Sequence, residues 1–233
     1  PVKASVFMKI PLLIWGESAE NEIGGPISSL DSNVLDRRWL EEFGGLLGLR
    51  TNDMADILQI PKDKLIMYTY PTDEELKNNG TTGLFLGQFL PWDGHQNALI
   101  AEQHGFKPYV KDVEGSIVNY ENLDNVYMRI HDYFKFLKYG YDRVTDWCCT
   151  HIRRGRMSRE EAIKINQSKS GKFPEEYLGY KLSEILDEIN CTREEFIKIC
   201  DKFTNKSLFM CNNKNELVKD DKLNLILKNN EYK

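Results

Sequence analysis

Apolar and polar positions in the first half of the chain follow patterns that predict strands and helices. The continuous apolar run at 10–15, with Pro11 and Gly16 at its limits, predicts a buried strand, and 83–90 predicts a second. The other predicted elements of this half are a helix at 36–47, a short helix at 54–60, a strand or extended segment at 65–70, and a helix at 97–104 closed by Gly105.

The second half of the chain predicts helices. Three capping boxes, TDEE at 72–75, SREE at 158–161 and TREE at 192–195, mark helix starts, because each hydroxyl accepts an amide hydrogen while the glutamate reaches back. Periodic apolar positions predict further helices at 123–139 and 145–154, each followed by a glycine. Two or three more helices are expected between 174 and 203.

The composition changes from mixed α/β to helical near residue 120. We therefore expect an α/β part over 1–119, a helical region over 120–210, and an Asn- and Lys-rich flexible tail over 211–233. The predicted strands are too few for a complete doubly wound sheet, so the fold class is α/β, the edge of such a sheet followed by a mainly helical region. The first nine residues read like the last turns of a helix, and we expect the chain to begin inside a domain.

Charge and composition indicate a cytoplasmic globular protein. The net charge of −5 argues against a general nucleic-acid-binding protein. The sequence has no apolar run of the roughly 20 residues that cross a bilayer, and no signal-like start. The five cysteines are odd in number and form no CxxC pair, which favours reduced thiols. A zinc site made by Cys191, Cys200 and Cys211 is an alternative, with a spacing unlike that of known zinc ribbons.

Two loops that follow the predicted strands contain candidate chemistry. In WGESAENEIGG, Glu17, Glu20 and Glu22 could hold Mg²⁺ or orient an amine, and the alternative is a solvated polar loop. In PWDGHQN, Asp93 could cap a helix whose amino end holds an anion, while Trp92 could stack on a ring. The alternative there is a capped turn with a buried tryptophan.

The stretch from 129 to 159 is rich in Lys and Arg and forms a local positive field suited to phosphate or carboxylate. The alternatives are an ordinary solvated helix surface, or arginines that hold helices together through Asp142, Asp146 and Glu160. From the residues alone, the chain reads as part of a cytoplasmic α/β enzyme with a helical region that favours phosphate.

Seven segments, in order between residues 10 and 209, resemble the N-acetyl sugar amidotransferase family. They are IPLLIWGE, TGLFLGQFLPWDGHQNALIAEQHGF, NYENLD, IHDYFKFLKYGYDRVTD, IRRGRMSREEAI, YLGYKLSEIL and FTNKSLF. The resemblance implies a Rossmann-like sheet of the PP-loop (HUP) type and a role in bacterial surface sugars, such as lipopolysaccharide, pseudaminic or legionaminic sugars.

The resemblance further implies an enzyme that converts a sugar acetamido group into an acetamidino group. ATP, with Mg²⁺, would adenylate the amide oxygen, and ammonia from a glutaminase subunit would displace AMP. The substrate would be a nucleotide-linked or free N-acetyl sugar, with no nucleic acid or membrane partner. The SGGxDS loop that binds ATP in this family is absent from the sequence, and GGPISS at 24–29 lacks its aspartate. We therefore expect the carboxy-terminal part of such an enzyme, inactive alone.

With this resemblance, Glu17 and Asp93 are predicted to be catalytic. The residues predicted to bind substrate are Trp92, His95, His131, Lys135, Lys138, Arg143, Arg153 and Arg156. No metal ligand is predicted.

Two other functions stay open. The chain could be a non-catalytic remnant that docks a glutaminase or a paralogue. It could also be another PP-loop ligase, such as a tRNA thiolase or an asparagine-type ligase, although the acidic charge and the lack of a CxxC cysteine argue against tRNA.

Overall fold

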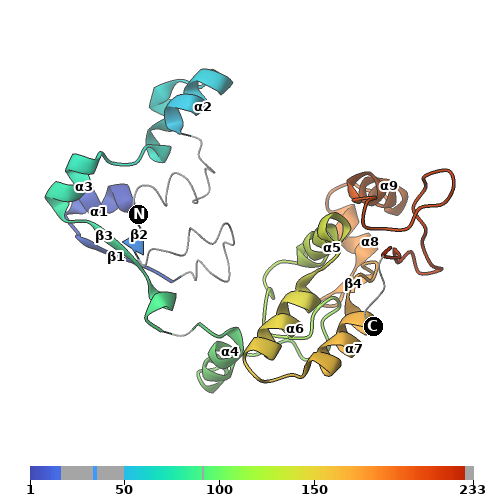
Figure 1. The fold of residues 1–233 in the computed structure, drawn as a ribbon. Coiled ribbons are helices and arrows are strands. Elements are labelled where there is room, and N and C mark those ends of the chain that lie inside the picture. Colours follow the sequence, from blue (N-terminus) through green and yellow to red (C-terminus); the bar gives the residue numbers. More distant parts are fainter. Residues whose placement is uncertain (17–33, 36–49, 91, 229–233) are drawn as a thin grey trace. The chain divides into compact units, whose positions relative to one another are not determined.

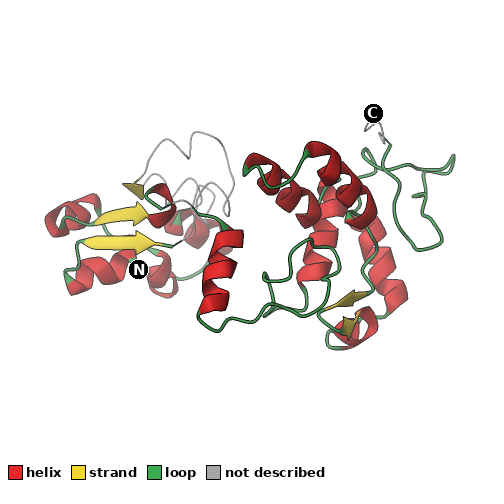
Figure 2. Ribbon diagram, turned by 90° about the horizontal axis from the view of Figure 1, so that it is seen from below, coloured by secondary structure: helices red, strands yellow, loops and turns green. Residues whose placement is uncertain are grey.

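The computed structural model describes residues 1–16, 34–35, 50–90 and 92–228 (Figure 1). The chain divides into two compact units, Pro1–Asn97 and Ala98–Lys233, and helix α4 (Gly94–Gln103) spans the division. The three-stranded sheet lies in the first unit, whereas helices dominate the second (Figure 2). The predicted helix at 36–47 lies outside the described residues. The predicted boundary near residue 120 falls within the second unit, and the domain limits stay a prediction.

The first unit is built on a small mixed sheet with the strand order β1-β3-β2. Strand β1 (Leu12–Trp15) pairs in parallel with β3 (Thr82–Phe85), while β2 (Val34–Leu35) pairs with β3 in the antiparallel sense. Both strands predicted from the apolar runs are confirmed, and the α/β class with them. One parallel pair does not establish a Rossmann-like sheet, so that arrangement stays a prediction.

The described helices of this unit alternate with its strands along the chain. Helix α1 (Val2–Met8) precedes β1, and α2 (Thr51–Leu58), a 3-10 helix (Lys62–Tyr68) and α3 (Asp73–Asn79) lie between β2 and β3. The capping box at α3 is confirmed, because the Thr72 hydroxyl accepts the Glu75 N–H at 3.2 Å and the Glu75 carboxylate accepts the Thr72 N–H at 2.7 Å. The predicted strand or extended segment at 65–70 is wrong, because only Leu65 of this run is buried and its apolar side chains do not alternate between two faces.

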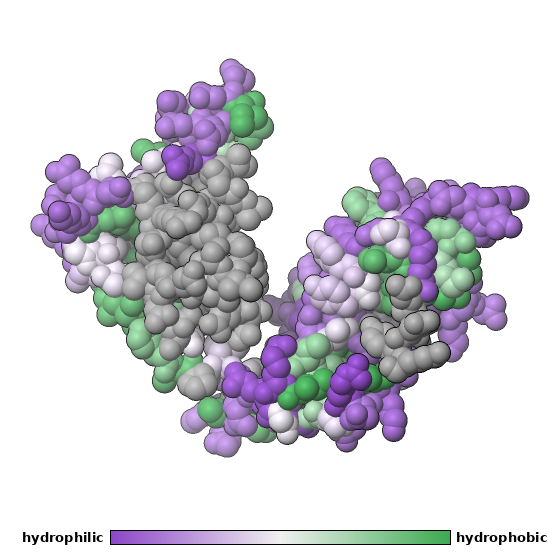
Figure 3. Space-filling model, in the orientation of Figure 1, coloured by the Kyte–Doolittle hydropathy of each residue, from purple (hydrophilic) through white to green (hydrophobic). Residues whose placement is uncertain are grey.

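Strand β3 ends earlier than the apolar run predicts. Phe85 is 2% exposed, but a 3-10 turn, Leu86–Gln88, follows it, and Phe89 and Leu90 are 59% and 60% exposed. Hydrophobic residues gather on the surface along the strands of this unit (Figure 3), Ile14 of β1 among them. Apolar character therefore marks the strand but not its end, because the run continues past the buried residues.

Beyond α4, the described part of the second unit consists of five helices and a short hairpin. They are α5 (Met128–Tyr139), α6 (Arg143–Arg153), α7 (Arg159–Lys169), β4 (Glu176–Tyr177), β5 (Tyr180–Lys181), α8 (Leu182–Asp187) and α9 (Arg193–Phe203). Its largest core cluster includes Tyr133, Leu137 and Phe209, and Leu137 and Phe209 are fully buried. The helix predicted at 123–139 begins only at Met128. The helices of the described ranges include none that is long and apolar enough to span a bilayer.

The capping boxes of α7 and α9 are confirmed. The hydroxyls of Ser158 and Thr192 each accept the amide hydrogen of the third residue beyond them, at 3.2 Å. Because these motifs close within four residues, the local sequence suffices to place the helix starts.

The chain after α9 returns to the core. Isolated antiparallel β-bridges join the backbone of Phe209 to Leu227, of Cys211 to Leu217, and of Lys219 to Leu225. Leu225 is 8% exposed and belongs to the main core cluster. Widely spaced leucines in a polar sequence anchor the described part of this segment, and the flexibility expected for 211–233 stays a prediction.

We predict that Gly171→Ala destabilises the protein more than Gly155→Ala. Both glycines have positive φ, +69° and +67°, so alanine is strained at either by about 1–2 kcal/mol. A Cβ at Gly171 would overlap the Phe136 ring, whereas one at Gly155 would meet nothing within 4 Å. The overlap adds about 1–3 kcal/mol. Urea denaturation of both variants measures the difference, and equal losses would contradict the packing argument.

Candidate anion-binding site

Asp93 caps helix α4. The Asp93 carboxylate accepts the His95 N–H at 3.1 Å, and the Asp93 carbonyl accepts the Asn97 N–H at 2.9 Å. This fits the capped-turn interpretation, although Trp92 is 38% exposed rather than buried. The binding and catalytic roles predicted for this loop stay predictions. Glu17 and its acidic loop lie outside the described residues.

Three predicted substrate-binding residues lie on α5. His131 is 67% exposed at its side chain, and its Nδ1 lies 3.2 Å from the Asp132 carboxylate. Lys135 pairs with Asp146 and also lies over the Tyr141 ring, 4.7 Å from its centroid. The third residue is Lys138, whose ammonium lies over an aromatic ring of α9 at 5.5 Å. The two lysines are thus engaged within the unit, and the His131 side chain is more exposed than that of Lys135.

Arg143 is held by carboxylates from two directions. Its Nε and Nη2 donate to the two oxygens of Asp132 at 2.6 and 3.1 Å, and Nη1 lies 3.5 Å from Glu121. Burial tends to lower the pKa of Arg143, but the hydrogen bonds and charges of Asp132 and Glu121 outweigh it and raise the pKa. A substrate anion would have to compete with both carboxylates, so the geometry favours a structural role for Arg143, in which it links α6 to α5 through Asp132.

The other two predicted arginines lie at the turn between α6 and α7. Arg153 is exposed and donates to the Thr150 hydroxyl at 3.2 Å. Arg156 is half-buried, and its Nε donates to His151 Nδ1 at 3.0 Å. A guanidinium can only donate, so this bond requires His151 Nδ1 to be unprotonated. The bonding of Arg153 to a neutral hydroxyl leaves its charge available for an anion more readily than that of Arg143.

A chain of polar contacts joins Arg143 to this turn, and the sequence interpretation missed its middle members. Glu121, beside Arg143, accepts the Trp147 indole N–H at 2.9 Å. The rings of Trp147 and His151 lie 5.4 Å apart, and His151 in turn accepts from Arg156. Glu121 precedes Trp147 by 26 positions, so no local spacing signals their pairing.

Asp142 is a buried carboxylate that caps α6. It is 1% exposed, and it accepts the N–H groups of Val144 at 3.1 Å and Gly171 at 2.9 Å. Burial raises the pKa of Asp142, although these hydrogen bonds and one from Ser170 act to lower it. Asp142 therefore ties the start of α6 to the segment after α7.

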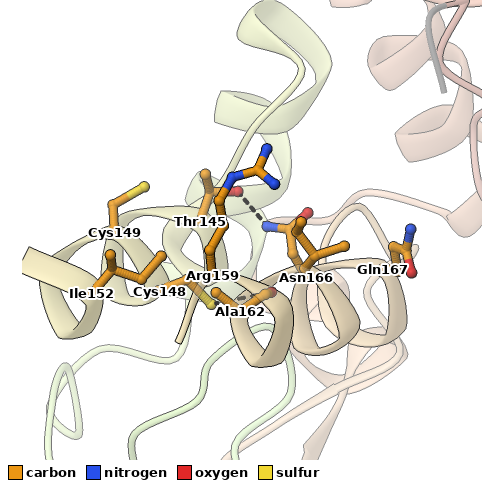
Figure 4. Close-up of a pocket in the computed structure, with 9 residues that line it drawn as sticks. Thr145, Cys148, Cys149, Ile152, Arg159, Ala162, Asn166 and Gln167 are labelled. Atoms are coloured by element: carbon orange, nitrogen blue, oxygen red, sulfur yellow. Dashed lines mark hydrogen bonds between the residues drawn. The ribbon is translucent and has the colours of Figure 1, made fainter. Parts of the chain in front are cut away.

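A small apolar groove lies between α6 and α7, with a cavity of about 160 Å³ (Figure 4). Cys148 and Ala162 form its floor, and Asn166 donates to Thr145 across it at 2.7 Å. The sulfurs of Cys148 and Cys149 point apart (Figure 4). Burial raises the pKa of Cys148, so its thiol has little thiolate character.

The described residues form no cluster of three or more side chains suited to a metal ion, and all five cysteines are free thiols. These ranges therefore offer no cage made of three or more protein ligands for a metal ion. The acidic loop at Glu17, which the sequence suggested for this ion, lies outside them.

Comparison with known families identifies the helical region. Residues 114–222 match the family model described as LPS biosynthesis protein WbpG-like, C-terminal domain. This confirms the resemblance to the carboxy-terminal part of the family that the sequence motifs indicated. A search of curated proteins found no match.

We predict that Arg143→Ala lowers the free energy of unfolding by about 3 kcal/mol, because it leaves the buried Asp132 carboxylate without its guanidinium partner. The matched control, Arg153→Ala, should change it by less than about 0.5 kcal/mol, as is usual for an exposed side chain. Chemical denaturation of both variants is the measurement. A similar loss in the two would show that Arg143 is not part of the frame.

The raised pKa of Asp142 gives a prediction on pH. A raised folded-state pKa means that the native state holds the proton more tightly, so this stabilisation is present below the ordinary value of 3.8 and is lost as pH rises through the raised pKa. The asparagine of an Asp142→Asn variant cannot ionise. The stability of the natural protein relative to this variant should therefore fall as pH rises above the ordinary value of 3.8 and through the raised pKa. Parallel pH profiles for the two proteins would contradict the buried ionisation.

Proposed function

Since residues 114–222 match the family model described as LPS biosynthesis protein WbpG-like, C-terminal domain, we propose that the chain is the carboxy-terminal part of an ATP-dependent N-acetyl sugar amidotransferase. The family match is the observation that carries the proposal. The order of the sequence motifs between residues 10 and 209 supports the same enzyme class over nearly the whole chain.

The proposed reaction exchanges the oxygen of an acetamido group for nitrogen. The amide oxygen attacks the α-phosphorus of ATP and pyrophosphate leaves. Ammonia then adds to the amide carbon, AMP departs with the former amide oxygen, and a proton is lost to give the acetamidine. An amide oxygen is a poor leaving group, and adenylation provides a good one. The ammonia would come from a glutaminase partner.

The proposed contribution of this chain is recognition of the anionic sugar substrate. Arg153 and Arg156, at the turn between α6 and α7, would contact its phosphate or carboxylate, with Lys135, Lys138 and His131 on the neighbouring helix in support. Arg143 keeps the helices in place through Asp132. Because the sequence contains no SGGxDS loop, the chain alone should not exchange ATP with pyrophosphate.

The oxygen transfer gives a direct test of the proposal. The complete protein is supplied with ATP, ammonia and a panel of nucleotide-linked N-acetyl sugars labelled with oxygen-18 in the acetamido group. We expect the label in AMP and an acetamidino sugar as product, both detected by mass spectrometry. Pyrophosphate release with the label retained in the sugar, or no turnover of any sugar in the panel, would contradict the reaction.

The same assay separates binding from structure at the basic turn. Arg153→Ala should raise KM by about ten- to a hundred-fold, since a charge-assisted hydrogen bond contributes about 1.5–3 kcal/mol. The melting temperature should be unchanged. An unchanged KM in a folded variant would remove Arg153 from the site.

A further inference from the structure

The second unit contains a larger hollow that none of the predicted site residues lines. Its cavity of about 350 Å³ lies within the size range of small-molecule sites, whereas the groove between α6 and α7 is smaller than that range. The residues around it come from the end of α5, the end of α7 and the returning tail. They are Phe136, Gly140, Asn166, Gln167, Ser170, Gly171, Lys172, Asn224, Leu225 and Leu227.

Two glycines belong to the lining of the hollow and pack closely against its side chains. Gly140 and Gly171 both have positive φ, and a Cβ at Gly171 would overlap the Phe136 ring. A Cβ at Gly140 would lie 3.4 Å from Leu227. The backbone thus forms part of the wall, and Leu227 of the tail lies next to Gly140.

The polar groups of the hollow have unused hydrogen-bonding capacity. Within the described ranges, the Gln167 amide makes no hydrogen bond and the Asn166 side-chain oxygen accepts none, while its nitrogen donates to Thr145. The Ser170 hydroxyl bonds to Asp142 and keeps its acceptor side. Donors and acceptors therefore stand side by side around the hollow.

The hollow also has one cationic and one apolar side. Lys172 is exposed and forms no ion pair within the described ranges, although Asp220 lies near enough to feel its charge. Phe136, Leu225 and Leu227 are the apolar side chains of the lining. A pyranose ring has the matching chemistry, because its hydroxyls both donate and accept while its C–H face is apolar.

We propose that this hollow binds the ring of a monosaccharide bearing an acidic group, phosphate or carboxylate, with Gln167 and Asn166 on its hydroxyl or acetamido groups and Lys172 on the acid. The choice of a sugar that carries an acetamido group rests on the proposed function. The site itself stands on the lining, the volume and the unused hydrogen-bonding groups.

Ligand-observed NMR and calorimetry on the chain test the site without ATP or turnover. The probes are N-acetylglucosamine 1-phosphate, N-acetylglucosamine, inorganic phosphate and glucuronic acid. Glucuronic acid carries a carboxylate in place of the phosphate. We expect saturation transfer to the ring protons of the sugars, and tighter binding of the two acidic sugars than of the neutral one. Absence of sugar binding, or inorganic phosphate binding as tightly as the sugar phosphate, overturns the proposal.

Variants identify the hollow as the place of binding. Lys172→Ala should weaken the acidic sugars by about ten-fold and leave N-acetylglucosamine nearly unchanged, while Gln167→Ala should weaken all the sugars by about three- to ten-fold. Lys164→Ala is the matched control, since Lys164 is exposed on α7, the helix that carries Gln167, and does not line the hollow. Equal losses in the Lys172 and Lys164 variants would overturn the assignment.

The two proposals fail in different ways. Transfer of oxygen-18 to AMP, together with full sugar affinity in the Lys172 and Gln167 variants, would reject the hollow and keep the amidotransferase. Sugar binding that depends on these residues, without oxygen transfer, would reject the reaction and keep the binding site.

Discussion

The buried guanidinium of Arg129 holds together three parts of the second unit that are distant in sequence. Arg129 is 2% exposed, donates from Nε to Glu114 at 2.9 Å, and donates from Nη2 to the carbonyl of Lys172. Glu114 in turn accepts the N–H groups of Glu175 and Glu176, each at 3.1 Å. A buried charge is tolerated only when it is paired in this way. The loop that contains Glu114, helix α5 and the segment after α7 therefore stabilise one another.

This arrangement also restricts what may stand beside the guanidinium. Gly115 has a φ of +73°, and a Cβ there would lie 2.7 Å from Arg129 Nη1. The hydrogen bond from Arg129 to the Lys172 carbonyl holds the backbone of Gly171 and Lys172, which both line the hollow. The shape of the hollow thus follows from an ion pair that lies outside it.

Local signals in the sequence were sufficient for elements that close within a few residues. The capping boxes at Thr72, Ser158 and Thr192 each place a helix start, because both partners lie in one turn. Contacts between distant segments had no such signal. The pairing of Arg143 with Asp132 joins two helices, and counting basic residues between 129 and 159 did not show which cations carboxylates already held.

The sequence also does not show which arginines are buried and bound to carboxylates and which are exposed. Arg129 and Arg143 look like Arg153 in a sequence, but burial and carboxylate partners separate them in space. Glu121, which links Arg143 to Trp147, comes from an irregular loop, where no periodicity exists to predict a direction. Composition alone therefore does not show which arginines carboxylates already hold.

The returning tail bears on where a fragment of this region can be cut for expression. The family match ends at residue 222, yet Leu225 and Leu227 pack on the main core cluster beyond it. At the other end the match begins at Glu114, although Tyr109 and Val113 pack against Tyr177 and Ile185 of the same unit. A fragment trimmed to the matched limits would expose apolar core at both ends and aggregate, whereas one that spans 98–228 keeps the core closed.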